Sequence, residues 1–260
     1  MTTTFSAAAN GVGHAGGGHA GGGRDLALPH DSSREQGALD LAAVIAPEEP
    51  ARDGRVARGQ RTRRTVAEAL MEVLRAGDPD PTAKAVAWRA GVSLRLVFHH
   101  FADMDDLYQF VAALQLRRQW ADLPQLSATL SLPTRIERTV AHRAAHFEAI
   151  SPVRRALVCR APTSPAVRQA IDAADTLLLE DLKATFAPEL RELPASTRAD
   201  HVGAMDTCTS WEAWERLRTA SGIPVRGARR VMSLMLTALC PDAEDGGPLR
   251  AAVGPTPTIS

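Results

Sequence analysis

The chain has 260 residues, 45% of them hydrophobic, which is enough to bury the core of one large domain or two modest ones. Its formal net charge of zero excludes a generally basic coat for nucleic acid. No apolar run approaches the roughly 20 residues that span a bilayer, and the N-terminus lacks the basic and apolar segments of a secretion signal. We therefore expect a cytoplasmic protein with no membrane contact.

The two ends of the chain differ in composition from its middle. Residues 13–23 form a near-repeat of Gly, His and Ala that offers almost nothing to bury, so residues 1–50 are predicted to be a disordered tail. Residues 241–260, rich in Gly and Pro, are predicted to form a second disordered tail.

A local basic segment follows the first tail. Residues 51–64 hold six arginines and one aspartate, a net charge of +5. A concentrated positive segment in an otherwise neutral chain suits contact with phosphate groups, although a solvated arginine run is the alternative interpretation.

Residues 82–107 predict two short helices joined by a tight turn at Gly91, followed by a third helix that starts near Asp103. Thr82 and Ser93 can cap the two short helices by accepting a hydrogen bond from a free backbone N–H. The second helix is too short to bury much apolar surface, so its exposed side chains can enter a DNA major groove. This pattern predicts a DNA-binding regulator.

The same segment resembles the helix-turn-helix of the tetracycline-repressor (TetR) family of bacterial transcription regulators. The matching residues are Ala90-Gly91-Val92-Ser93, Val97, His100-Phe101, Asp105-Asp106 and Leu107. The basic run from Arg58 to Arg64, followed by Val66, Ala67, Leu70, Val73 and Leu74, resembles the family's entry into its first helix. The resemblance covers about the span from Arg58 to Phe110.

The resemblance also implies which residues meet DNA. Arg95 can read a guanine with its two-pronged guanidinium, and a phosphate contact is an equally open reading. Lys84, His99 and His100 occupy family contact positions, whereas Trp88 is expected to be a packing residue. The candidate DNA-binding residues are Arg58, Arg61, Arg63, Arg64, Thr82, Lys84, Ser93, Leu94, Arg95, Phe98, His99 and His100.

Three positions depart from the family pattern. Leu96, Phe98 and Met104 stand where many members carry Thr, Tyr and Lys, whose polar atoms bond phosphate. The apolar replacements predict a weaker grip on the DNA backbone, unless the neighbouring arginines compensate.

The remainder of the chain predicts helices only, punctuated by prolines. The predicted helices run over about residues 103–121, 134–150, 153–159, 165–186, 196–220 and 225–239. The last of these has almost no polar face, so we expect a second copy of the chain to cover it. The family resemblance implies the same dimerising end, and the expected interface residues are Trp214, Val231, Met232, Met235, Leu236 and Leu239.

No catalytic or metal site is predicted. The acidic run at Asp103 to Asp106 is similar to a motif of some terpene cyclases, but here it begins a helix, where carboxylates are favourable. His142 and His146 lie one helical turn apart without an assured third ligand, and the cysteines at 159, 208 and 240 lack CxxC spacing. We therefore expect no enzyme activity, no metal, no cofactor and no disulfide.

Together these observations predict an all-α protein with a helix-turn-helix head over residues 51–110 and a ligand-binding and dimerisation body over residues 111–240. The resemblance implies a homodimeric repressor that binds a palindromic double-stranded operator and is released by a small-molecule effector. Abundant Met, Leu and Ala favour an apolar or amphipathic effector. The alternative is a ligand- or protein-binding module of the same fold that has lost its grip on DNA.

Overall fold

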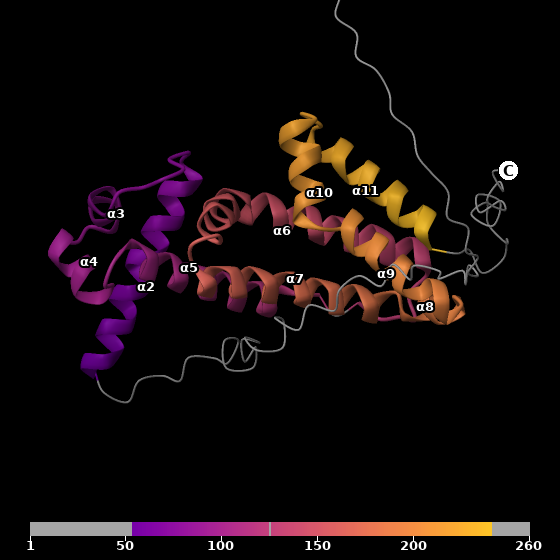
Figure 1. Cartoon of the computed structure of the whole chain (residues 1–260), viewed down its shortest axis with the longest axis horizontal. Helices are drawn as coiled ribbons and strands as arrows, with labels where there is room; N and C mark the ends of the chain where they lie inside the picture. Colours follow the sequence, from indigo (N-terminus) through magenta and orange to yellow (C-terminus); the bar gives the residue numbers. More distant parts are fainter. Residues whose placement is uncertain (1–53, 125, 241–260) are drawn as a thin grey trace, which may run out of the picture. The chain divides into compact units, whose positions relative to one another are not determined.

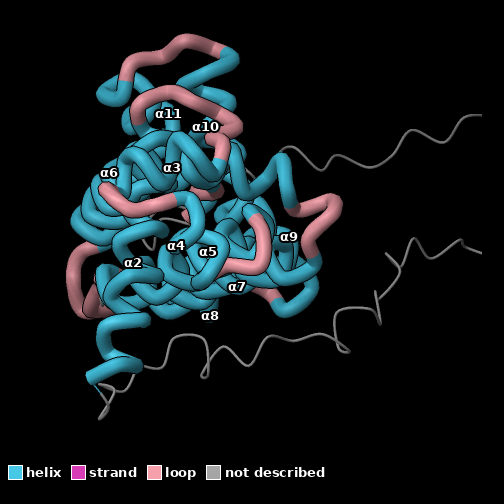
Figure 2. The backbone as a smooth tube through the Cα atoms, turned by 90° about the vertical axis from the view of Figure 1, so that its left-hand side faces the viewer, coloured by secondary structure: helices cyan, strands magenta, loops and turns pink. Residues whose placement is uncertain are grey.

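The computed structural model describes residues 54–124 and 126–240 (Figure 1). The described residues form helices joined by loops, and Figure 2 shows no strand among them. The predicted all-α fold class is confirmed. The two predicted tails, residues 1–50 and 241–260, lie outside the described residues.

The head consists of α2 (Gly54–Arg75), α3 (Ala83–Ala90) and α4 (Leu94–His100), which pack on one another, and α5 (Met104–Asp122) follows directly. Asp103 and Asp106 make a reciprocal cap at the start of α5. The Asp106 N–H donates to Asp103 Oδ1 at 2.8 Å, and Asp106 Oδ2 accepts from the Ala102 N–H at 3.1 Å. The acidic run is therefore a helix cap, as its position predicted.

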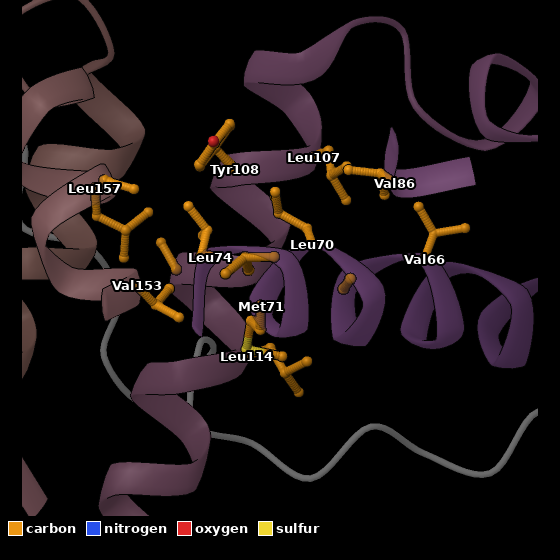
Figure 3. Close-up of a cluster of buried hydrophobic side chains, with 14 of the residues drawn as sticks. Val66, Leu70, Met71, Leu74, Val86, Leu107, Tyr108, Leu114, Val153 and Leu157 are labelled. Atoms are coloured by element: carbon orange, nitrogen blue, oxygen red, sulfur yellow. The ribbon is translucent and has the colours of Figure 1, made fainter. Parts of the chain in front are cut away.

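The core of the head continues into later helices. Leu70 and Leu74 of α2 lie beside Leu107 of α5, and Val153 and Leu157 of α6 (Leu132–Arg160) close the same cluster (Figure 3). All five side chains are buried. The head therefore shares its core with α5 and α6.

The body contains α7 (Pro165–Thr185), α8 (Ala187–Glu192), α9 (Ala195–Cys208), α10 (Trp211–Glu215), a π-helical turn η2 (Arg216–Ala220) and α11 (Val225–Leu239). Helix α5 packs along α7, and α6 contacts α7, α10 and α11. Helix α11 also packs on α9. This arrangement makes α6 the central helix of the body.

The predicted break at Pro152 is wrong, because α6 runs through this proline. Proline removes one backbone donor and crowds the preceding turn, which costs about 3 kcal/mol in a helix interior. The residues on both sides of the break, Phe147 and Val153, are fully buried. Their packing outweighs the local penalty.

The predicted single helix over residues 196–220 is also wrong. Helix α9 ends at Cys208, and Ser210 caps a new helix by accepting from the Ala213 N–H at 3.1 Å. The break turns Trp211 and Trp214 into the core, where both are buried. An uninterrupted helix could not redirect these two side chains.

Three features are absent from the described residues. In the part of the chain that the structure describes, no helix is both long and apolar enough to cross a membrane. Within residues 54–124 and 126–240, no three side chains of His, Cys, Asp or Glu are grouped to hold a metal ion. The three cysteines form no disulfide.

Candidate functional site

The corner between α3 and α4 is a capped helix-turn-helix. Thr82 accepts from the Ala85 N–H at 3.2 Å, and Ser93 accepts from the Leu96 N–H at 3.2 Å. Gly91 between them has φ 66°, a left-handed conformation that side-chain-bearing residues adopt at a cost. These local features fix the direction in which α4 leaves α3.

Helix α4 turns one side to the core and the other to solvent. Val97 is buried and Leu96 is half-buried, whereas Leu94, Arg95, Phe98 and His99 are exposed. Leu94 and Phe98 lie one helical turn apart, as do Arg95 and His99, so the four side chains form a single outward surface. This outward surface of α4 is defined here as the four residues Leu94, Arg95, Phe98 and His99.

The charge around this surface has one sign. Residues 82–100 contain Lys84, Arg89 and Arg95 but no aspartate or glutamate. Lys84 and Arg95 are exposed, whereas Arg89 pairs with Glu72 of α2 at 2.6 Å. A corner without acidic residues attracts a polyanion.

The predicted phosphate contact of Arg63 needs correction. Its guanidinium lies 4.4 Å from the Phe101 ring centroid and 4.8 Å from that of Phe110, and it donates to the His100 carbonyl. It also approaches Asp106 at 3.8 Å. Arg63 faces inward because its spacing from Leu70 and Leu74 places all three on one side of α2. It holds the end of α4 in place.

The other predicted arginines of α2 lie differently. Arg58, Arg61 and Arg64 are exposed on the N-terminal half of the helix. No acidic residue occurs between Gly54 and Ala67, so this half of α2 is positively charged. It is suited to contact with the sugar-phosphate backbone.

The predicted packing role of Trp88 is wrong. Trp88 is 83% exposed, because α3 buries Val86 and Ala87 on its opposite side. Met104 is half-buried against the core of the head, and Leu96 is half-buried in α4. Of the three departures from the family pattern, Phe98 alone is exposed.

The two histidines at the end of α4 are unequal. His99 is exposed, and His100 is half-buried with its ring near Gly59 of α2. Burial lowers the pKa of His100, and the neighbouring His99 and Arg63 lower it further. His100 is thus held in the neutral form at pH 7 and packs against α2.

The body contains a narrow cleft between α5, α6 and α7. It holds about 20 Å³ of free space, room for about one water molecule. Aliphatic side chains line most of it, and Gln115, Gln119 and Arg154 supply the polar groups. Gln119 donates to the Ala174 carbonyl at 2.9 Å, which ties α5 to α7 across the cleft.

Three buried arginines on α6 were missed by sequence reasoning. Arg135, Arg143 and Arg154 are almost fully buried, and each pairs with a carboxylate. Their partners are Glu189, Asp181 and Asp175. The available signal was the placement of arginines on the apolar side of an amphipathic pattern.

The pairing of these arginines is incomplete. Arg143 Nη2 donates to the Leu178 carbonyl at 2.6 Å and to Asp181 at 3.1 Å, but its Nε and Nη1 find no acceptor among the described residues. Arg154 Nε likewise finds no acceptor among the described residues. Burial lowers the pKa of Arg143 to about 10, and burial raises the pKa of Asp181. The interior of the body therefore keeps polar groups at a desolvation cost.

His142 and His146 lie half-buried on α6, near Arg143. Their rings stack with centroids 6.0 Å apart. Burial lowers the pKa of both, that of His146 to about 4, and His146 Nε2 has no partner among the described residues. The pair lines the inside of α6, and the nearby Glu148 instead accepts from Trp214 Nε1 at 2.9 Å.

The expected interface residues divide into two groups. Trp214, Met232 and Leu236 have no exposed surface in the single chain, so the prediction that they meet a partner needs correction. They pack within the core of the body. Val231, Met235 and Leu239 are half-buried, and Leu234 on the same helix is 71% exposed. Helix α11 is amphipathic, with its arginines on the side away from the core.

Comparison with known proteins supports the fold. The structure is similar to the crystal structure of a transcriptional regulator from Rhodococcus sp. Rha1, with a TM-score of 0.55 and 18% sequence identity. The similarity covers 68% of this chain and 95% of that chain. No family model and no curated protein matches the chain. The likeness shows a shared fold.

Proposed function

We propose that the protein is a DNA-binding transcription regulator of the tetracycline-repressor kind. The observation that carries the proposal is the capped corner of α3 and α4, with an exposed α4 in a segment without acidic residues. The fold shared with a transcriptional regulator adds support. In this proposal the head, about residues 51–110, binds a double-stranded operator, and the body, about residues 111–240, binds an effector and a second copy.

The contact residues have separate roles in the proposal. Arg95, on the outward surface of α4, reads a base edge, because a guanidinium can bond guanine O6 and N7 together. Arg61, on the exposed basic half of α2, contacts phosphate and carries no sequence information. Thr82 and Ser93 serve through their caps, since each hydroxyl already accepts a backbone N–H.

Two variants, Arg95→Ala and Arg61→Ala, test these separate roles. Their binding to the operator is measured over a range of salt concentrations. Arg95→Ala should cost about 1–3 kcal/mol and relax the preference at one base pair of each half-site. Arg61→Ala should weaken binding to all sequences alike and reduce the salt slope by about one. Identical behaviour of the two variants would contradict the proposed roles.

The proposed dimer uses the outward side of α11. Val231, Leu234 and Ala238 lie on one side of the helix, adjacent to the half-buried Met235. Leu234→Glu should leave the chain folded and weaken self-association at least about tenfold, about 1.4 kcal/mol. Leu236→Glu is the matched control, because it buries an unpaired charge and should unfold the chain. A wild type that sediments as a monomer at micromolar concentration would remove the operator-dimer mechanism.

The proposed effector site is the cleft between α5, α6 and α7. Arg154 lines this cleft and its Nε–H finds no acceptor among the described residues, which favours a ligand with a hydrogen-bond acceptor over the apolar ligand that composition suggested. Opening the cleft would shift α5, which leads directly from the head. The effector can change DNA affinity only if it binds the two states unequally.

A second candidate function is a protein-binding module whose head no longer grips DNA. Exposed Trp88 and Phe98 favour it, because aromatic side chains are frequent at protein interfaces. A gel-shift with DNA from the protein's own promoter region separates the two functions. Absence of any shift at low salt would favour the protein-binding module.

A further inference from the structure

The outward surface of α4 is half apolar, which is unusual for a surface surrounded by positive charge. Leu94 is 42% exposed and Phe98 is 48% exposed, and the two lie one helical turn apart. The described residues leave almost half of the surface of each one uncovered. An exposed leucine alone needs no explanation, but two large apolar side chains among the four outward residues of a recognition helix point to an occupant with an apolar group.

The charge around the pair identifies the occupant as DNA and not an apolar protein groove. Arg95 lies between Leu94 and Phe98 on the same surface, and Lys84 is exposed on the preceding helix. Residues 82–100 hold no carboxylate to balance them. An occupant must therefore combine a high negative charge with apolar groups within reach of α4.

The major groove of B-DNA offers one apolar group, the 5-methyl of thymine. A recognition helix enters this groove with its N-terminal residues against the base edges. Leu94 is the first residue of α4, and Phe98 is one turn further along the same side. Thymine methyl groups beside Leu94 and Phe98 would bury these side chains and leave the neighbouring Arg95 free to bond a guanine.

We infer that Leu94 and Phe98 recognise thymine 5-methyl groups in each operator half-site. This inference rests on the proposed DNA-binding function and deepens it. Under this inference, the phenylalanine at position 98 contacts a base where a tyrosine hydroxyl would bond phosphate. The departure from the family pattern then adds base recognition. The surface then reads a guanine through Arg95 and at least one adjacent thymine through the apolar pair.

The test removes single methyl groups from the DNA. The full-length protein first selects its operator from a random duplex pool, and each thymine of a half-site is then replaced by deoxyuridine. This replacement keeps the base pair and its hydrogen-bonding edge. Loss of a contacted methyl should weaken binding about three- to fivefold, the transfer effect of one buried methyl-sized group.

Protein variants assign each methyl to a side chain. In Leu94→Ala or Phe98→Ala, the deoxyuridine penalty at one position should fall to nearly onefold, since the side chain that sensed the methyl is gone. Both residues are exposed, so both variants should melt like the wild type. Trp88→Ala is the matched control, an exposed apolar residue on α3, and should retain every penalty.

The outcomes are distinct. A wild type that selects no DNA overturns the proposed function and the inference together. A wild type that binds its operator but tolerates deoxyuridine at every position overturns the inference and leaves the function standing. Penalties that persist unchanged in both α4 variants also overturn it, because they would then come from the shape of the DNA.

Discussion

Folded proteins usually bury apolar side chains and expose charged ones, and the head and the body depart from this rule in different ways. The head places large apolar groups on its surface, with Trp88 83% exposed and Phe98 48% exposed. The body places charged groups in its interior, where Arg143 is only 1% exposed. The buried charges cost stability in an isolated chain, whereas the exposed apolar groups only forgo burial that a partner could supply.

The two regions differ in how their stability depends on contacts with a partner group. An exposed apolar side chain costs the folded head little stability, so the head remains folded while its surface is free. Burial by a partner would then add a favourable contribution. A buried charge needs a partner, so the body depends on the ion pairs of Arg135, Arg143 and Arg154 along α6. The head can therefore gain from a new contact, whereas the body depends on contacts that it already makes.

The largest effect is expected from breaking a buried pair. Arg143→Met leaves Asp181 without its partner, which should lower the free energy of unfolding by about 3–5 kcal/mol. The double variant Arg143→Met with Asp181→Leu should recover most of this loss, because it removes both desolvated charges. Urea unfolding of the full-length protein measures both.

A control for this prediction lies on the same helix. Arg155 pairs with Glu215 at 2.8 Å, but its side chain is 49% exposed. Arg155→Met should therefore cost less than about 1 kcal/mol. A double variant of Arg143 and Asp181 as unstable as Arg143→Met alone would contradict the argument from desolvation.

The second effect is a dependence of stability on pH. Burial lowers the pKa of His146 from 6.5 to about 4, so between these values the unfolded chain binds a proton that the folded chain does not. Stability should therefore fall as the pH drops through this window. His146→Leu should remove about 2 kcal/mol of the loss between pH 7 and pH 4.5. Urea midpoints at the two pH values provide the test.

The comparison of the wild type with His146→Leu isolates the contribution of His146 to the pH dependence of stability. Burial raises the pKa of Asp175 and of Asp181, which opposes the histidine effect at low pH, but these groups are present in both proteins. His142, whose pKa burial also lowers, remains in the variant. Equal slopes of stability against pH in wild type and variant would show that His146 reaches water.

Local signals in the sequence predicted much of the head. Thr82 and Ser93 form the predicted caps, and Gly91 takes the left-handed conformation expected of it, because a cap depends on residues three positions apart. Helix α11 likewise has its predicted bounds, Val225–Leu239. These features need no knowledge of distant contacts.

Long-range packing decided what sequence reasoning missed. Arg63 shares a side of α2 with Leu70 and Leu74, but the rings that receive its side chain, Phe101 and Phe110, are far along the chain. Pro152 sits inside α6 because tertiary packing on both sides outweighs its local preference. The pairing of Arg143 with Asp181 depends on how α6 meets α7.

A third, smaller effect separates the two kinds of arginine on α2. Arg63→Ala removes two ring contacts and the bond to the His100 carbonyl, and should lower the free energy of unfolding by about 1–2 kcal/mol. Arg61→Ala, at an exposed position, should change it by less than about 0.5 kcal/mol. Thermal and urea unfolding compare the two. Equal losses would contradict the structural role of Arg63.

The smallest effect is expected at the most exposed tryptophan. Trp88→Ala should change the free energy of unfolding by less than about 0.5 kcal/mol, because most of the indole surface is already exposed. Trp214→Ala is the matched control: this indole is fully buried and donates to Glu148, so its removal should cost about 3–5 kcal/mol. Urea unfolding of both variants measures the contrast. A loss above about 1 kcal/mol in Trp88→Ala would mean that another copy of the chain covers Trp88 in solution. The apolar surface of the head would then be already occupied, and DNA would have to displace that copy to reach α4.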